Sequence, residues 1–123
     1  MPNILVVDDD ALIRDMLVDY FEAQGHHVIA APNGVSGLRM AQAVHPDLII
    51  LDVDMPQMTG LEVCKRLRES PETSKLRILM LTARKTEKDV TKALDLGADA
   101  YMPKPFSLAE MGLRSKMLLG LER

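Results

Sequence analysis

The chain has 123 residues, of which 47% are hydrophobic types, and this length predicts one domain over residues 1–123 that buries roughly two-thirds of its unfolded surface. The mild formal net charge of -3 and the lack of a basic run argue against direct binding to nucleic acid, and the single Cys64 excludes an intramolecular disulfide. No apolar stretch reaches the about 18 residues of a membrane span and no N-terminal signal pattern is present, so we expect a cytoplasmic protein without a membrane partner.

Strand and helix patterns alternate from the N-terminus onward. Short apolar runs predict strands at residues 4–7, 27–31 and 48–51. Helical spacing of apolar side chains predicts a helix over about 11–24, which ends at a glycine, and another helix after the turn at residues 32–34.

The second half of the chain continues the alternation. Thr59 and Glu62 have the spacing of a capping box, which predicts a helix that runs to about Glu69. The remaining predicted elements are a strand at 77–81, a helix from its cap Thr86 through Leu96, a strand at 99–102, and a last helix that starts at a second capping box, Ser107 and Glu110.

Together these elements predict an α/β fold. The connections are too long for hairpins, so the strands should be parallel with right-handed crossovers. Continuous Val, Ile and Leu runs are typical of strands that helices bury on both faces. We therefore expect a doubly wound parallel sheet of five strands flanked by five helices, with Pro103 in an edge strand.

Carboxylates directly follow two of the buried strands. Asp8 and Asp9 come after the first strand, and Asp52 comes after the third. Because the carboxyl ends of parallel strands meet at one edge of the sheet, these acids should converge there. Carboxylate oxygens suit Mg²⁺, so we expect a magnesium site. Asp10 is better explained as the N-cap of the following helix.

Two further polar side chains should reach the same edge. Thr82 follows the fourth strand and Lys104 follows the fifth. Each would be unremarkable alone, but a cation, an ammonium and a hydroxyl around a carboxylate suit phosphoryl transfer. Asp52 would then be the nucleophile and would form an acyl phosphate.

Over nearly its whole length the chain resembles the receiver domains of two-component response regulators. Four segments carry the resemblance: Ile4 to Asp9, the loop from Asp52 to Gly60, Leu81-Thr82-Ala83, and Lys104-Pro105-Phe106. The resemblance implies a flavodoxin-like three-layer sandwich with strand order 2-1-3-4-5. It also implies a phosphoacceptor signalling domain.

The resemblance assigns a role to each site residue. Asp9 and Asp52 would coordinate Mg²⁺ together with the backbone carbonyl of Asp54, and Asp8 would help through water. Asp52 would take a phosphoryl group from the phosphohistidine of a sensor histidine kinase or a histidine phosphotransfer protein. Lys104 would pair with a phosphoryl oxygen, and a cis Lys104-Pro105 bond is implied.

The same resemblance implies a conformational switch. Thr82 would move to hydrogen-bond the phosphoryl group and Tyr101 would follow it, although Tyr101 could also be an ordinary packing residue. The signal would reach the surface formed by helix 86–96, strand 99–102 and the last helix. A downstream effector or an output domain would read that surface.

Asp54 and Arg84 depart from the commonest receiver pattern. They lie two residues after the acceptor and the switch threonine, where they could tune dephosphorylation. We expect an ion pair between them across the mouth of the site. The alternative is two separate solvated charges.

The last helix is apolar on more than one face, which suggests a partner surface. We advance a phosphorylation-dependent homodimer as a hypothesis, with an unpartnered helix end as the alternative. Asp99 and Arg114 resemble charges that transcription-factor receivers use to dimerise, but Ala100 stands where a second acid is often found.

The competing function is a haloacid-dehalogenase-like phosphatase. Asp52-Val53-Asp54, Thr82 and Lys104 mimic its nucleophile motif and partners. Against it, the acid pair precedes the Asp-x-Asp motif, and 123 residues leave no room for a cap domain. Whether the chain counts as an enzyme stays open, since a signalling switch of this kind mainly promotes its own phosphorylation and dephosphorylation.

Overall fold

A computed structural model describes residues 3–83 and 87–120 of the chain. The five strands are β1 (Asn3–Val7), β2 (His27–Ala31), β3 (Leu48–Asp52), β4 (Arg77–Thr82) and β5 (Ala100–Pro103). The five helices are α1 (Ala11–Ala23), α2 (Gly34–Val44), α3 (Gly60–Glu69), α4 (Glu87–Asp95) and α5 (Leu108–Leu118). All strand pairs are parallel and their order is β2-β1-β3-β4-β5, which confirms the expected topology.

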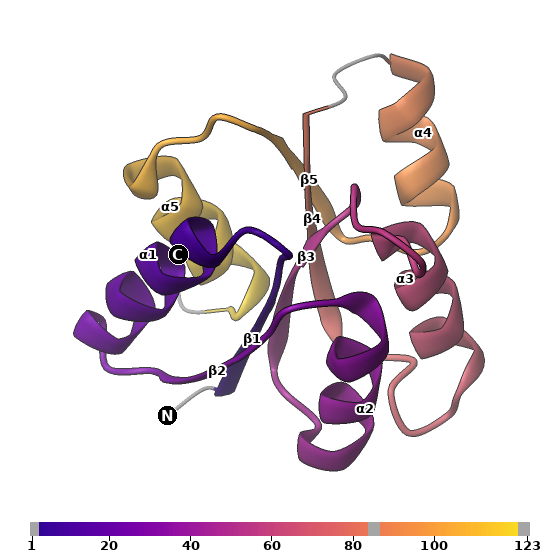
Figure 1. The fold of residues 1–123 in the computed structure, drawn as a ribbon, viewed down its shortest axis with the longest axis horizontal. Coiled ribbons are helices and arrows are strands. Elements are labelled where there is room, and N and C mark those ends of the chain that lie inside the picture. The colour runs from indigo at the N-terminus through magenta and orange to yellow at the C-terminus, as the bar shows by residue number, and fades with distance from the viewer. Residues whose placement is uncertain (1–2, 84–86, 121–123) are drawn as a thin grey trace.

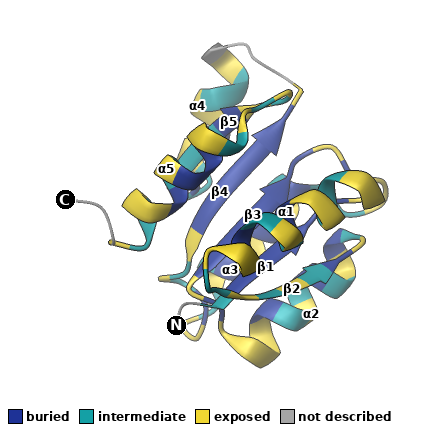
Figure 2. Ribbon diagram, turned by 90° about the vertical axis from the view of Figure 1, so that its left-hand side faces the viewer, coloured by how far each residue is buried: buried dark blue, intermediate teal, exposed yellow. Residues whose placement is uncertain are grey.

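Two helical layers enclose the sheet, as Figure 1 shows: α1 and α5 cover one face, and α2, α3 and α4 cover the other. Strand side chains alternate between two separate cores. Leu5 and Val7 belong to the core that includes α2 and α3 residues, whereas Ile4 and Val6 belong to the core with α1 and α5 residues. The central strands β1, β3 and β4 are therefore largely buried, while the outer helix faces are exposed (Figure 2).

Local capping signals start the helices where the sequence predicts. The Asp10 side chain accepts hydrogen bonds from the backbone of Leu12 and Ile13, which confirms its role as N-cap of α1. Thr59 and Glu62 form the full capping box of α3. Ser107 accepts from the Glu110 backbone at the start of α5. The predicted cap Thr86 lies outside the described residues.

Two strand boundaries differ from the prediction in a way that matters for the site. β3 and β4 each run one residue further and include Asp52 and Thr82, because both residues keep pairing with the neighbouring strand. Pro103 ends β5, which is an edge strand. Proline has no backbone N–H and therefore suits an edge strand.

Asp99 has an intramolecular role at the opposite edge of the sheet. Its carboxylate lies 2.8 Å from Arg68 Nη2 and accepts a 2.8 Å hydrogen bond from the Ile78 backbone N–H. Arg68 also donates to the carbonyl oxygens of Gly97, Ser74 and Leu76. These contacts fasten α3 to the loops before β4 and β5, so Asp99 is a structural partner of Arg68 within the chain.

No helix among the described residues is both long and apolar enough to cross a membrane.

Candidate functional site

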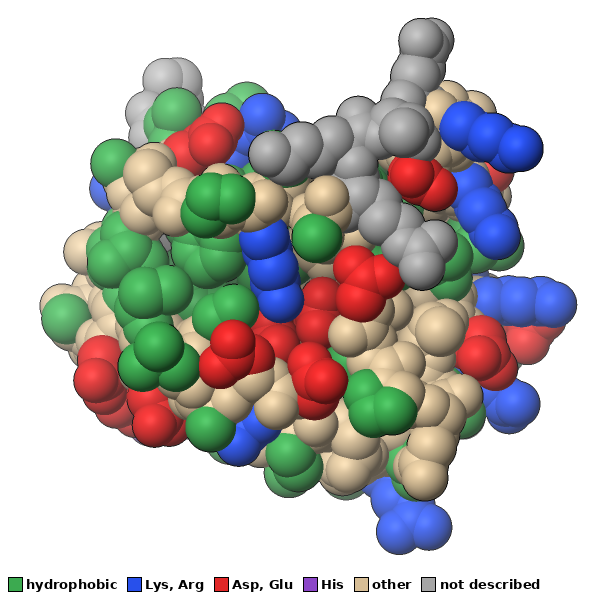
Figure 3. Space-filling view, turned by 45° about the horizontal axis from the view of Figure 1, so that its top comes forward, with side chains coloured by type: hydrophobic (Ala, Val, Ile, Leu, Met, Phe, Trp, Pro, Cys, Tyr) green, Lys and Arg blue, Asp and Glu red, His purple; other side chains and the backbone are tan. Residues whose placement is uncertain are grey.

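The predicted residues gather at the carboxyl edge of the sheet because four parallel strands end there. Asp8 follows β1, Asp52 ends β3, Thr82 ends β4 and Lys104 follows β5. Asp8, Asp52 and Thr82 are almost fully buried, with 1%, 2% and 1% of their surfaces exposed. Viewed toward this edge, acidic side chains gather at the centre of the molecular surface with a basic side chain against them (Figure 3).

Three carboxylates are close enough to share a cation. One oxygen each from Asp8, Asp9 and Asp52 lie within 4.8 Å of one another. Asp8 Oδ2 is buried, and the Lys104 ammonium lies 3.0 Å from it. This set of clustered hard oxygens fits Mg²⁺.

Lys104 bridges the two buried carboxylates. Its Nζ lies 3.0 Å from Asp8 Oδ2 and 3.3 Å from Asp52 Oδ1. Its backbone N–H donates to the Thr82 carbonyl oxygen at 2.8 Å, which ties the residue to the end of β4. The Lys104-Pro105 peptide bond is cis, as the resemblance implied.

The site raises the pKa of Asp52 and the pKa of Lys104, which favours the neutral form of the acid and the charged form of the lysine. Burial, assisted by the charge of Asp8, raises the pKa of Asp52 to about 7, although Lys104 and the Asp54 backbone N–H oppose this shift. Burial alone would lower the pKa of Lys104, but its pairing with Asp8 and the charge of Asp52 outweigh burial and raise it. Lys104 therefore stays protonated, whereas the Asp52 carboxylate ionises near neutral pH.

The loop after β3 places Asp54 between the acceptor and the switch threonine. The Asp54 backbone N–H donates to Asp52 Oδ1 at 3.2 Å. The Thr82 hydroxyl donates to Asp54 Oδ2 at 2.9 Å. Arg84 lies outside the described residues, so its expected ion pair with Asp54 stays a prediction.

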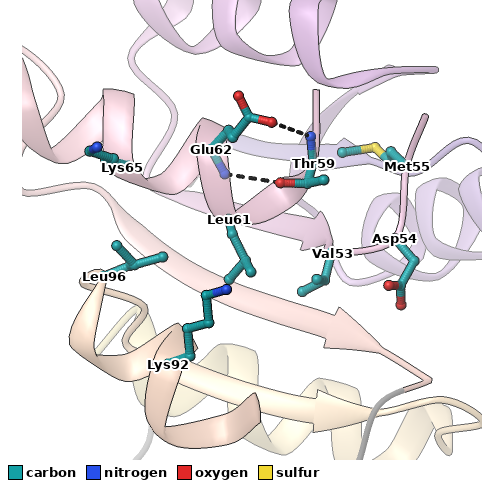
Figure 4. A pocket seen from close by; sticks show the side chains of 9 residues that line it. All are labelled: Val53, Asp54, Met55, Thr59, Leu61, Glu62, Lys65, Lys92 and Leu96. Atoms are coloured by element: carbon teal, nitrogen blue, oxygen red, sulfur yellow. Dashed lines mark hydrogen bonds between the residues drawn. The ribbon is translucent and has the colours of Figure 1, made fainter. Parts of the chain in front are cut away.

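Tyr101 is half-buried on β5 and lines a small cavity together with Thr82. The cavity has a volume of about 30 Å³ and lies between β4, β5 and α4. A wider groove of about 580 Å³ separates α3 from α4, and Asp54 lies at its edge while Lys92 reaches into it from α4 (Figure 4). The groove is adjacent to the acidic cluster and does not contain Asp8, Asp9 or Asp52.

Two residues shape the site in ways that were not predicted: Arg14 was not singled out, and Gly60 was named only as the end of the loop from Asp52. The Arg14 side chain donates to the Asp8 carbonyl oxygen at 2.8 Å and so secures the turn after β1. A side chain at Gly60 would collide with the backbone of Asp52 and Val53, so this start of α3 strongly favours glycine. The helical position of Arg14 gives no sequence signal, but a glycine directly after a helix cap signals a close approach.

Comparisons with known proteins agree on one family. The profile of the response regulator receiver domain matches residues 4–115. The chain is 47% identical over 117 residues to the alkaline phosphatase synthesis transcriptional regulatory protein PhoP of Bacillus subtilis, covering 95% of the chain and 48% of PhoP. It is 41% identical over 119 residues to the DNA-binding dual master transcriptional regulator RpaA of Synechocystis sp., covering 97% of the chain and 49% of RpaA. The chain thus spans about half the length of these relatives.

Solved structures give the same result. The chemotaxis protein CheY4 of Vibrio cholerae superposes on this chain with a TM-score of 0.91 at 32% identity. The superposition covers 96% of this chain and 98% of CheY4. A putative response regulator from Chloroflexus aurantiacus has a TM-score of 0.91 at 35% identity, with 97% and 98% of the two chains covered. Neither comparison supports the phosphatase alternative. The chain belongs to the receiver domain family of two-component response regulators and is a phosphoacceptor signalling domain.

Proposed function

We propose that Asp52 accepts a phosphoryl group from a phosphohistidine in a magnesium-dependent reaction, and that residues 1–123 act as one receiver domain. One observation carries this assignment: Lys104 Nζ lies 3.3 Å from Asp52 Oδ1 at the buried tip of β3. A carboxylate placed this way has a cation beside it to offset the charge that a phosphoryl group brings.

Asp8, Asp9, Asp52 and the backbone carbonyl of Asp54 would hold the Mg²⁺ ion. The mutual proximity of the three carboxylates supports this set. When bound, Mg²⁺ would neutralise phosphoryl oxygens and favour the ionised form of Asp52. Charge balance points the same way, because Lys104 alone offsets only one of the carboxylates it contacts.

The transfer exchanges one bond to phosphorus for another. An ionised Asp52 oxygen attacks the phosphorus atom, a P–O bond forms, and the P–N bond to the donor imidazole breaks with its electron pair leaving on nitrogen. Lys104 moves from a carboxylate oxygen to a phosphoryl oxygen, a short displacement because it already contacts Asp52. Burial of Asp52 excludes bulk water from the acyl phosphate.

The phosphoryl group would then change the surface formed by α4, β5 and α5. Thr82 would donate its hydroxyl to a phosphoryl oxygen, and Tyr101, which lines the same cavity, would follow the movement of β4. Asp54, with Arg84, would tune how fast water removes the group. A sensor histidine kinase or a histidine phosphotransfer protein would supply phosphate, and a downstream effector or output domain would read the surface.

Labelling with a small phosphodonor tests the assignment. We expect wild-type protein to incorporate phosphate from acetyl phosphate with Mg²⁺ and not with EDTA, and we expect Asp52→Asn to incorporate none. Asp19→Asn is the matched control, because it changes an exposed acid on α1 outside the site and should retain label. Label in Asp52→Asn would overturn the assignment.

A further inference from the structure

The hydroxyl group of Thr82 is already committed to a partner in this structure. Thr82 Oγ1 donates to Asp54 Oδ2 across 2.9 Å, between residues 28 positions apart in the chain. Figure 4 shows the Asp54 side chain turning from the loop after β3 toward the end of β4. A hydroxyl has one proton to donate, so this bond and a bond to a phosphoryl oxygen compete for the same proton.

Backbone contacts hold both partners in position. The Asp54 backbone N–H donates to Asp52 Oδ1 at 3.2 Å, and Asp52 is the last residue of β3. The Thr82 carbonyl oxygen accepts from the Lys104 N–H at 2.8 Å. The bond between Asp54 and Thr82 therefore connects the ends of β3 and β4. The end of β3 carries the acceptor Asp52, and the end of β4 carries the backbone contact to Lys104.

We propose that Asp54 is a positioning residue that holds the Thr82 hydroxyl in the resting protein and must release it before Thr82 can donate to the phosphoryl group. This inference rests on the proposed function, because it concerns the same site. It assigns Asp54 a role before phosphate arrives, which differs from its proposed effect on dephosphorylation. Asp54 thereby opposes the active conformation until a phosphoryl oxygen displaces it as acceptor.

The size of the effect follows from the kind of bond. A hydrogen bond to a charged acceptor shifts an equilibrium by about tenfold to a hundredfold. Asp54 is exposed, so water competes with Thr82 and the lower end applies. We therefore expect loss of the Asp54 carboxylate to raise the population of the active conformation by about tenfold, and a ligand that selects this conformation should gain apparent affinity by the same factor.

The first measurement observes Thr82 directly in protein without Mg²⁺ or phosphate. Three-bond couplings to the threonine methyl carbon report the χ1 rotamer of Thr82, and its signal is identified by its loss in Thr82→Val. We expect one rotamer in wild type, rotamer averaging in Asp54→Ala, and one rotamer in Asp54→Asn, whose side-chain oxygen still accepts. A single unchanged rotamer in Asp54→Ala would overturn the proposal.

The second measurement separates the hydrogen bond from simple charge repulsion. Removal of the Asp54 charge should raise the affinity for beryllofluoride with Mg²⁺ in any background, since beryllofluoride is an anion. In Asp54→Ala, loss of the hydrogen bond should raise the affinity for beryllofluoride by a further factor of about ten when Thr82 is present. The same change should add no such factor in the Thr82→Val background. Equal gains in the two backgrounds would contradict the role of Asp54.

Failure of the proposed function would look different. Wild-type protein that binds no beryllofluoride and takes no phosphate on Asp52 would refute phosphoryl acceptance, while the rotamer measurement would still decide whether Asp54 holds Thr82. Phosphorylation of Asp52 with no coupling between Asp54 and Thr82 would refute only this inference.

Discussion

Lys104 allows two buried carboxylates to lie side by side at the edge of the sheet. Asp8 and Asp52 have almost no exposed surface, yet both contact the same ammonium group. One cation does not balance two buried anions, and this imbalance raises the pKa of Asp52 to about 7 through burial first and the Asp8 charge second. The residues that would bind Mg²⁺ thus cost stability in its absence.

The first prediction concerns this cost. The pKa of Asp52 is higher in the folded protein, about 7, than its usual value of 3.8, so the folded state binds more protons between these values. The ionisation of Asp52 therefore lowers the free energy of unfolding progressively as pH rises from about 4 to about 7. Above pH 7 the loss is constant. In EDTA, Asp52→Asn should raise the free energy of unfolding by about 1–3 kcal/mol at pH 8 and by much less at pH 4.5. Denaturant unfolding at both values measures it, and a gain independent of pH would contradict the explanation.

The second prediction concerns Lys104 itself. Lys104→Met leaves two buried carboxylates without their cation, so the metal-free protein should lose about 2 kcal/mol of stability at pH 7. The same change removes a competing cation from the carboxylates, so Mg²⁺ should bind about tenfold more tightly. Calorimetric titration with Mg²⁺ tests this, with Lys92→Met as a control lysine outside the cluster. Weaker Mg²⁺ binding in Lys104→Met would show that the ion does not share these carboxylates.

Among the elements, the start of α3 determines where Asp52 and Asp54 lie. Thr59 caps the helix and accepts from Glu62, while Gly60 lies directly against the backbone of Asp52. The Gly60 N–H also donates to the Val53 carbonyl oxygen at 3.1 Å. The start of α3 is thus packed directly against the end of β3, and this contact sets the position of the acceptor Asp52.

The third prediction compares two neighbouring changes at this helix start. Thr59→Ala removes a cap and should cost about 1 kcal/mol of stability while Asp52 still accepts phosphate. Gly60→Ala places a methyl group into the backbone of β3 and should cost about 1–3 kcal/mol and also slow labelling of Asp52. Thermal unfolding and acetyl phosphate labelling measure the two effects. Equal labelling of the two variants would show that Gly60 does not position the acceptor.

The elements also show which features a sequence can predict. Strands, caps and glycine stops depend on neighbours within a few residues, so Asp10 could be separated from Asp8 and Asp9 as a cap. Shared strand ends placed Asp52, Thr82 and Lys104 together, because parallel topology alone brings them to one edge. The bonds from Thr82 to Asp54 and from Arg68 to Asp99 join residues 28 and 31 positions apart, and side-chain direction across elements decides them.

On the scale of the whole molecule, exposed apolar side chains occur on both helices of the proposed output surface, α4 and α5. Leu94 on α4 is 46% exposed, and Leu113 and Met117 on α5 are 51% and 60% exposed. The two α5 residues are four positions apart and so lie on one side of the helix. Arg114 contacts Glu110 within α5, and Asp99 is held by Arg68, so apolar contacts rather than these charges would support a homodimer.

The fourth prediction tests this homodimer. Sedimentation of wild-type protein should show association when beryllofluoride and Mg²⁺ are added, and Leu113→Glu with Met117→Glu should abolish it by burying charges in the contact. Val44→Glu is the control, because Val44 is 43% exposed on α2, away from this face. A wild-type protein that stays monomeric with beryllofluoride would refute the homodimer and leave the phosphoacceptor assignment unaffected.

The central claim is that Asp52 forms the acyl phosphate, and borohydride trapping tests it most directly. Borohydride reduces an aspartyl phosphate to homoserine with release of phosphate, so the reacted residue can be located by mass spectrometry of its peptide. After treatment with acetyl phosphate and Mg²⁺, we predict homoserine at position 52 and unmodified aspartate at positions 8, 9 and 54. Homoserine at another of these positions, or none in phosphorylated protein, would contradict the account.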